Sequence, residues 1–141
     1  MAEARHVLGL RVYWEDTDAA GIVYYANYLR YFERGRSELV RARGIDQQRL
    51  LRQDGLMFAV RRVAVDYLAP ARLDDELQVE TCLTHLGAAT LDLAQSVRRQ
   101  ARTLAQGQVR LACIDRAGRS RRIPVGLRAC LSATDMTAKD R

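Results

Sequence analysis

The sequence contains few of the residues that build metal sites and disulfide frameworks. Its only histidines are His6 and His85, and its three cysteines lie far apart without a C-x-x-C pair. A structural zinc site needs about four cysteine or histidine ligands at short spacing, so we predict no metal site. An odd number of dispersed cysteines also argues against a disulfide framework. We therefore expect reduced thiols in a cytoplasmic protein.

Long apolar runs are absent as well. No segment approaches the roughly 20 consecutive apolar residues that a membrane-spanning helix requires, so we predict no transmembrane segment. The polar residues Met1–His6 are too few to form a signal peptide, and we expect none. With 141 residues and no repeat or linker, the chain fits a single domain. We expect that domain to span residues 1–131 and residues 132–141 to form a disordered tail.

Lysine is almost missing, because Lys139 is the only one and arginine carries nearly all of the positive charge. The net charge of +6 would attract nucleic acid, a phosphorylated cofactor or an anionic membrane face. Arginine suits phosphate recognition because its planar guanidinium can bind two oxygens at once. A genomic preference for arginine codons explains the same bias equally well. Composition alone therefore does not identify the partner.

One long helix is predicted near the N-terminus. Residues 27–43 have helical spacing and end at Gly44, with four positions on one face: Leu29, Phe32, Arg36 and Leu39. Gly35 lies in the middle of this helix, where glycine costs about 1 kcal/mol relative to alanine. We expect close approach of another backbone to compensate, with the helix packed tightly on a sheet. Shorter helical segments are expected within residues 46–55 and 124–131.

Alternating apolar residues predict the strands of an antiparallel sheet. The segments are residues 8–14, 57–67, 77–83, 91–97 and 109–113. The alternation changes phase at Arg61 and Arg62, which indicates a β-bulge. Because one helix precedes a run of strands, the fold class is α+β, with five to six antiparallel strands and one long helix. A single helix covers only one face of such a sheet, so we expect oligomerisation to cover more of it.

The segment from Trp14 to Tyr28, W-E-D-T-D-A-A-G-I-V-Y-Y-A-N-Y, is the most informative of the chain. It places Asp16 and Asp18 just before a predicted helix. The unpaired backbone N–H groups at a helix N-terminus can donate hydrogen bonds to an anion or to a polarised oxygen. Three interpretations are open for the D-x-D pair. It can hold a divalent metal beside phosphates, although only Glu15 offers further oxygen ligands. It can resemble an aspartyl phosphotransferase, although those folds are parallel. Finally, either aspartate can simply cap the helix or fix a turn.

The length of this motif favours a catalytic interpretation. The stretch from Arg11 to Glu33, R-V-Y-W-E-D-T-D-A-A-G-I-V-Y-Y-A-N-Y-L-R-Y-F-E, resembles the signature of hotdog-fold acyl-CoA thioesterases. Within the 4-hydroxybenzoyl-CoA thioesterase superfamily, it is most similar to the bacterial acyl-CoA thioesterases encoded with the Tol–Pal envelope system. The likeness continues in D-Y-L-A-P-A-R-L-D-D, residues 66–75, and covers residues 8–131. The resemblance implies a hotdog fold, in which the antiparallel sheet wraps around the long helix.

The resemblance also implies the roles of individual residues. Asp18 corresponds to the catalytic carboxylate, which either attacks the thioester carbonyl or activates water as a general base. The backbone N–H of Tyr25 corresponds to the donor that polarises the thioester oxygen. The remaining candidates for substrate binding are Gly21, Ile22, Val23, Tyr24 and Tyr28. Because coenzyme A carries phosphates, arginines are further candidates, namely Arg61 and Arg62 at the expected bulge and Arg119, Arg121 and Arg122 near the last turn; for each arginine alone, solvated surface charge is the favoured interpretation. For Tyr28, packing of helix on sheet is the favoured interpretation.

The resemblance implies partners as well. The substrate is an acyl-CoA, with acyl carrier protein as an alternative carrier, and the reaction needs no cofactor. Hotdog active sites lie between subunits, which implies a homodimer or homotetramer. Tol–Pal-linked members often carry histidine where this chain has Tyr25, whereas the hydroxybenzoyl type carries tyrosine. The acyl preference therefore stays open among short aliphatic, longer fatty and aromatic groups.

Three other functions can be compared with the sequence: a dehydratase, a non-catalytic acyl-binding or scaffold protein, and a nucleic-acid binder. A hotdog dehydratase needs a catalytic histidine in an H-x-x-x-F-P-G motif, and neither His6 nor His85 has that context. A non-catalytic acyl-binding or scaffold protein would keep the fold and lose turnover, but the intact loop around Asp18 argues against it. A nucleic-acid binder should place aromatic residues beside its arginines, and no such cluster or known module is present.

Overall fold

The computed structural model describes residues 4–132 of the chain. Of the tail expected for residues 132–141, Ser132 is instead the last residue of a helix, and the rest lies outside the described residues. The elements follow in the order β1 (Arg5–Arg11), η1 (Trp14–Asp16), α1 (Asn27–Ala42), α2 (Gln47–Asp54), β2 (Leu56–Tyr67), β3 (Glu76–Leu86), β4 (Thr90–Arg99), β5 (Arg102–Asp115) and α3 (Val125–Ser132). Within residues 4–132, no helix is both long and apolar enough to cross a bilayer.

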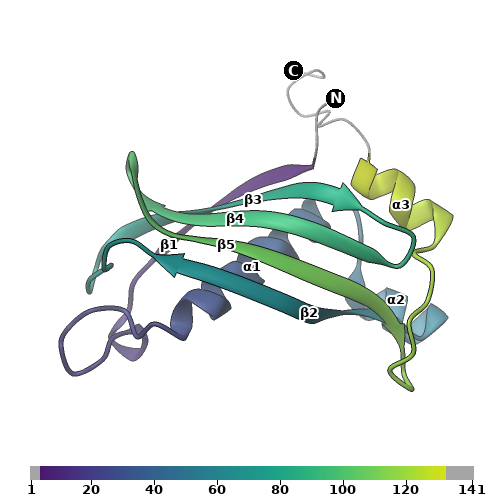
Figure 1. Ribbon diagram of the computed structural model, residues 1–141, viewed down its shortest axis with the longest axis horizontal. Helices are drawn as coiled ribbons and strands as arrows, with labels where there is room; N and C mark the ends of the chain where they lie inside the picture. Colours follow the sequence, from purple (N-terminus) through teal and green to yellow (C-terminus); the bar gives the residue numbers. More distant parts are fainter. Residues whose placement is uncertain (1–3, 133–141) are drawn as a thin grey trace.

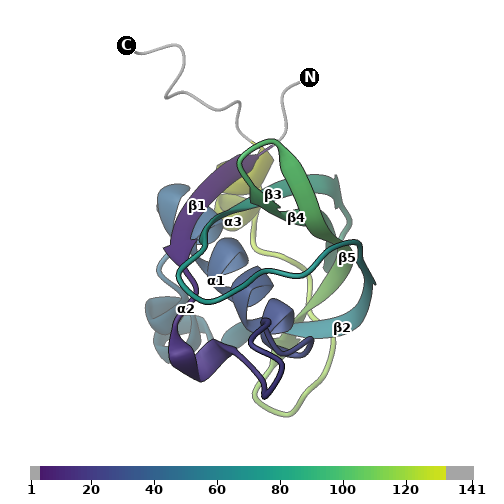
Figure 2. The same ribbon diagram turned by 90° about the vertical axis from the view of Figure 1, so that its left-hand side faces the viewer.

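The five strands form one antiparallel sheet in the order β1-β3-β4-β5-β2. The sheet lies along α1 (Figure 1) and curls around it, so that α1 is seen nearly end-on inside the curve in Figure 2. The expected α+β class is confirmed. The expected bulge is also present, because the pairing of β2 with β5 shifts register between Val60 and Arg62.

Gly35 lets α1 approach the sheet closely. A Cβ atom at this position would lie 2.7 Å from Thr81 Oγ1 and 2.9 Å from Val79 Cγ1. The expected close approach is therefore observed, but the neighbouring atoms belong to side chains of β3 and not to its backbone. Thr81 is itself buried and accepts a hydrogen bond from Gln95 Nε2 at 2.8 Å, so its polar atom is satisfied.

The core has two parts, one at each end of α1. The part at the N-terminal end of α1 includes Tyr28, Tyr31 and Phe32. It also includes Val12 and Val23 from the acidic loop, which comprises residues 12–26 between β1 and α1. The part at the other end of α1 includes Leu39 and Val40 and is closed by residues of α3. The N-terminal core thus fastens the acidic loop to the helix by apolar burial.

Three strands differ most in extent from their predicted ranges, and one of them, β3, continues three residues further than expected, to Leu86. The first strand begins and ends three residues earlier than expected, because β3 starts at Glu76 and offers no pairing partner beyond Arg11. Val12 N instead donates to Asp75 O at 2.9 Å, and Trp14 belongs to η1. The last strand is much longer than expected, since β5 spans 14 residues. Residues 105–108 of this strand, A-Q-G-Q, alternate small with polar side chains. They therefore lack the alternation of apolar and polar residues that predicts a strand.

Candidate functional site

The acidic loop ends in a tight turn that presents Asp18 to solvent. Asp18 N donates to Ile22 O at 2.9 Å and Gly21 N donates to Asp18 O at 3.0 Å, which closes the turn. Gly21 has φ of 78°, a left-handed conformation that favours glycine. The Asp18 carboxylate is exposed and accepts one hydrogen bond, from Ala20 N at 2.9 Å. Because the residue is exposed, a substrate or a water molecule can reach its remaining acceptor positions.

The neighbouring carboxylate, Asp16, has a different environment. Asp16 is buried, and its Oδ2 accepts a hydrogen bond from Tyr13 N at 2.9 Å. Its main-chain carbonyl accepts from Tyr24 N at 2.9 Å and from Asn27 Nδ2 at 2.8 Å. Burial and the negative charge of Asp16 beside it raise the pKa of the Tyr31 phenol. Asp16 therefore holds the two ends of the loop together and ties them to α1.

The start of α1 offers unpaired backbone donors beside this turn. Asn27 N donates to Tyr24 O at 2.8 Å and Tyr28 N donates weakly to Tyr25 O at 3.4 Å, so the first helical turn is formed. Among the described residues, no acceptor is found for the N–H groups of Tyr25 and Ala26. Such donors at a helix N-terminus carry partial positive charge and attract a polarised oxygen.

An apolar cavity of about 260 Å³ lies against the start of the helix. Residues from two segments that are distant in sequence line it: Ile22, Val23, Tyr25 and Tyr28 from the loop and α1, and Tyr67, Leu68, Ala69 and Pro70 from the end of β2. Asp18 is not part of the lining, but its backbone N–H binds the carbonyl of Ile22, which is part of it. No charged side chain is part of the lining.

Four of the predicted substrate-binding or polarising residues line the cavity, whereas the others do not. Those that line it are Ile22, Val23, Tyr25 and Tyr28, and those outside it are Gly21, Tyr24 and the candidate arginines, Arg61 and Arg62 among them. Tyr28 is 3% exposed, and its hydroxyl accepts from Ala71 N at 3.1 Å, so it both packs in the core and lines the cavity. Tyr24 is 46% exposed and stacks at a tilt on the Tyr25 ring outside the cavity. Arg61 and Arg62 are exposed on β2, roughly 17–20 Å from Tyr67 at about 3.3 Å per residue.

Sequence reasoning missed the contribution of Tyr67 and the three residues after it. They belong to the second stretch of family resemblance, D-Y-L-A-P, which carried no assigned role. In the structure Leu68 N and Ala69 N both donate to Leu104 O, which turns the chain away from the sheet and toward the helix start. The sequence signal was present, but only the fold places this stretch beside the loop.

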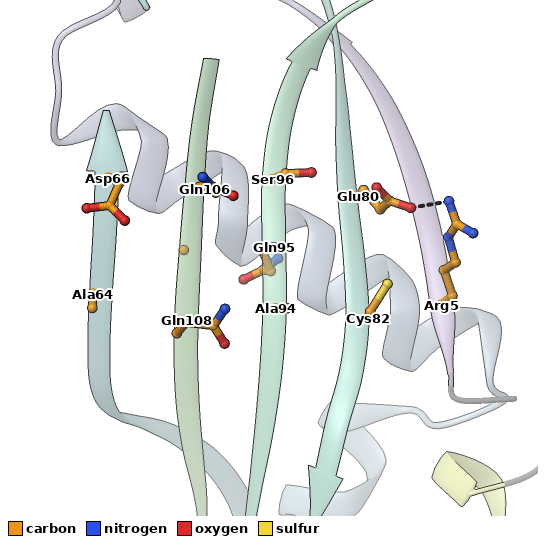
Figure 3. A pocket seen from close by; sticks show the side chains of 11 residues that line it. Arg5, Ala64, Asp66, Glu80, Cys82, Ala94, Gln95, Ser96, Gln106 and Gln108 are labelled. Atoms are coloured by element: carbon orange, nitrogen blue, oxygen red, sulfur yellow. Dashed lines mark ion pairs between the residues drawn. The ribbon is translucent and has the colours of Figure 1, made fainter. Parts of the chain in front are cut away.

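A second hollow, of about 540 Å³, lies on the face of the sheet that points away from α1. Figure 3 shows its polar side chains standing on neighbouring strands, with Glu80 ion-paired to Arg5 and the helix behind the sheet. It contains none of the predicted site residues, so the loop, the helix start and the cavity remain the candidate site. Among residues 4–132, no group of three or more histidine, cysteine, aspartate or glutamate side chains is arranged to hold a metal ion.

The profile of the thioesterase-like superfamily matches residues 12–133, which include the whole candidate site. The chain belongs to this superfamily. An acyl-CoA thioesterase, YbgC, of Haemophilus influenzae is 44% identical over 106 residues, which cover 75% of this chain and 78% of that protein.

Solved structures agree with the family. A probable thioesterase from Bartonella henselae has a TM-score of 0.83 and 36% identity, covering 86% of this chain and all of that chain. A mutant 4-hydroxybenzoyl-CoA thioesterase complexed with 4-hydroxybenzoyl-CoA has a TM-score of 0.86 and 19% identity, covering 92% of this chain and 99% of that chain. At that identity the likeness concerns the fold alone. The expected hotdog fold is confirmed.

Proposed function

We propose that this chain hydrolyses acyl-CoA thioesters, with Asp18 as the reacting carboxylate and the Tyr25 N–H as the donor that polarises the thioester carbonyl. The observation that carries the proposal is the meeting of three features at the start of α1. These are an exposed carboxylate, backbone N–H groups without acceptors among the described residues, and an apolar cavity lined by Tyr25 and by Ile22, the hydrogen-bond partner of Asp18 N. The thioesterase activity named for its relatives supports the same reaction.

Two routes are compatible with this arrangement. In the first, Asp18 attacks the carbonyl carbon, the thiolate of coenzyme A leaves, and water then hydrolyses the resulting mixed anhydride. In the second, Asp18 takes a proton from a water molecule that attacks the carbonyl carbon directly, the carbon–sulfur bond breaks, and the departing thiolate of coenzyme A takes up a proton. In both, negative charge develops on the carbonyl oxygen, and a main-chain donor at a helix N-terminus stabilises it. Neither route requires a cofactor.

Coenzyme A carries its phosphates far from the thioester, at the other end of the pantetheine arm. The distance of Arg61 and Arg62 from the cavity is therefore compatible with binding of these phosphates, and both residues remain candidates for that role. Acyl carrier protein as an alternative carrier, a cytoplasmic location and association with the Tol–Pal system also remain predictions. The rival function is a non-catalytic acyl-thioester-binding or scaffold protein. A panel of acyl-CoA substrates with detection of the released thiol tests the proposal, and no turnover of any thioester would favour the rival.

The lining of the cavity predicts a preference for uncharged acyl groups. Because no lining residue is charged, a carboxylate placed inside would lose its hydration without gaining a partner. We expect kcat/KM for succinyl-CoA to be at least about tenfold below that for butyryl-CoA, which has the same number of acyl carbons. Steady-state kinetics on both substrates measures this. Equal values would show that the acyl group does not enter this cavity.

The proposed site also needs a second subunit, and β2 is the strand that we expect to join two copies. β2 spans 12 residues at an edge of the sheet, so one row of its backbone N–H and C=O groups has no strand beside it. Val60 and Val63 on this strand are 51% and 40% exposed. The opposite edge, β1, is shorter, with seven residues, and so offers a shorter row of backbone groups for pairing.

Replacing both Val60 and Val63 with lysine should therefore convert a dimer into monomers and lower thioesterase activity. Light scattering coupled to size-exclusion chromatography measures the mass. The matched control is Val125→Lys on α3, where the valine is 84% exposed, and it should leave mass and activity unchanged. A double variant with the mass of the unmodified protein would exclude β2 as the interface.

A further inference from the structure

The side chain of Tyr67 joins the end of β2 to the start of α1. Its hydroxyl donates a hydrogen bond to Tyr25 O at 3.1 Å, across 42 positions of sequence. Its ring also meets the rings of Tyr25 and Tyr28 edge-on, with centroids 6.1 and 5.4 Å apart. A single side chain from the sheet thus contacts the residue whose N–H is proposed to polarise the substrate.

Tyr67 is well placed to act as a fixed support. It pairs with Ala105 at the last position of β2, and Leu68 N continues the attachment by donating to Leu104 O at 2.8 Å. Burial raises the pKa of the Tyr67 phenol, so the hydroxyl stays protonated and remains a donor at neutral pH. The donor is therefore fixed to the sheet, whereas its acceptor belongs to the loop that carries the site.

The carbonyl that Tyr67 binds is otherwise held only weakly. The other hydrogen bond to Tyr25 O comes from Tyr28 N at 3.4 Å, which is long for an N–H donor. The carbonyl before it, Tyr24 O, is held by Asn27 N at 2.8 Å. Of the two peptide groups that flank Tyr25, one is thus fixed by the helix and the other mainly by Tyr67. The Tyr25 N–H shares its peptide group with Tyr24 O, so Asn27 N sets its direction directly. Tyr67 holds the next peptide group, which follows Tyr25, and so restrains the backbone torsion angles of Tyr25 that connect this N–H to the helix.

We propose that Tyr67 is a positioning residue, which orients the main chain of Tyr25 toward the thioester through its hydroxyl. The inference rests on the function proposed above. A misdirected donor costs transition-state stabilisation more than substrate binding, because the negative charge on the carbonyl oxygen develops only as the reaction proceeds. Loss of the hydroxyl should therefore appear in kcat and leave KM nearly unchanged.

The test compares Tyr67→Phe with Tyr13→Phe. Tyr13 is an exposed tyrosine near the beginning of the acidic loop, so its replacement is a matched control. With the best acyl-CoA substrate of the panel, Tyr67→Phe should lower kcat by about threefold to tenfold, the worth of one hydrogen bond. Its KM and its melting temperature should match those of Tyr13→Phe. A kcat equal to that of the control, or a change confined to KM, would overturn the proposal.

Hydrogen exchange gives a second measurement that does not depend on turnover. In Tyr67→Phe, main-chain amides of residues 24–28 should exchange faster than in the unmodified protein, while peptides from β4 (Thr90–Arg99) keep their rates. If no thioester is hydrolysed by the unmodified protein, the proposed function fails, and exchange still decides whether Tyr67 holds the helix start. Unchanged exchange at residues 24–28 would overturn the positioning role by itself.

Discussion

Replacing Asp18 with asparagine is expected to lower kcat for acyl-CoA hydrolysis by about 10² to 10⁴-fold, the usual contribution of a positioned acid–base group. Asparagine keeps an oxygen that can accept the hydrogen bond from Ala20 N, so the turn and the fold should survive. It lacks the charge needed to attack a carbonyl or to take a proton from water. Thiol release under saturating substrate measures kcat, and a thermal melt confirms that folding is unaffected.

Two neighbouring carboxylates provide the controls for Asp18. Glu15 is exposed in the same loop, and Glu15→Gln should keep nearly full activity. Asp16→Asn should lose much less activity than Asp18→Asn, because Asp16 faces inward and its role is to accept from Tyr13 N, which an amide oxygen can also do. Equal rates for Asp18→Asn and the unmodified protein would remove Asp18 from the mechanism. A loss in Asp16→Asn as large as in Asp18→Asn would mean that the reacting carboxylate has been misassigned.

Much of the fold was predictable because its signals are local. The stop of α1 depends on Gly44, with φ of 81°, and the end of α2 depends on Gly55, with φ of 66°. The bulge in β2 appeared in the sequence as a change of phase at Arg61 and Arg62. The expected helical face was offset, however, since Leu29 is 41% exposed and Tyr28 takes the buried position beside it. A tyrosine whose hydroxyl finds a partner in the core is not recognised by apolar spacing alone.

The site was less predictable, because half of it depends on which segments the fold brings together. The loop and helix start are contiguous in sequence, so their residues were accessible to motif analysis. Residues 67–70 form one wall of the cavity, and the pairing of β2 with β5 brings them to the loop. No local sequence pattern predicts which strands pair. The different environments of Asp16 and Asp18 also arise from tertiary structure. Their spacing in the sequence is compatible with either one being the exposed carboxylate.

Gly35 predicts the largest effect on stability. A Cβ atom there would lie within 3.0 Å of both Thr81 Oγ1 and Val79 Cγ1, and 3.1 Å from Gln95 Nε2. The Gln95 side chain donates to Phe32 O at 2.9 Å and accepts from Arg36 Nη1 at 3.1 Å, so it cannot move without breaking hydrogen bonds. Even a methyl group must therefore separate α1 from β3 or disrupt this polar network.

We expect Gly35→Ala to lower the free energy of unfolding by about 1–3 kcal/mol, the usual cost of overpacking a core. The sign is informative, because alanine in an unobstructed helix should raise stability by about 1 kcal/mol. Gly126→Ala in α3 is the matched control, since no atom lies within 4 Å of its added Cβ, and it should be neutral or stabilising. Urea unfolding of both variants measures the difference. A Gly35→Ala variant as stable as Gly126→Ala would show that α1 can withdraw from the sheet at little cost, and that the helix start which carries the site is not rigidly held.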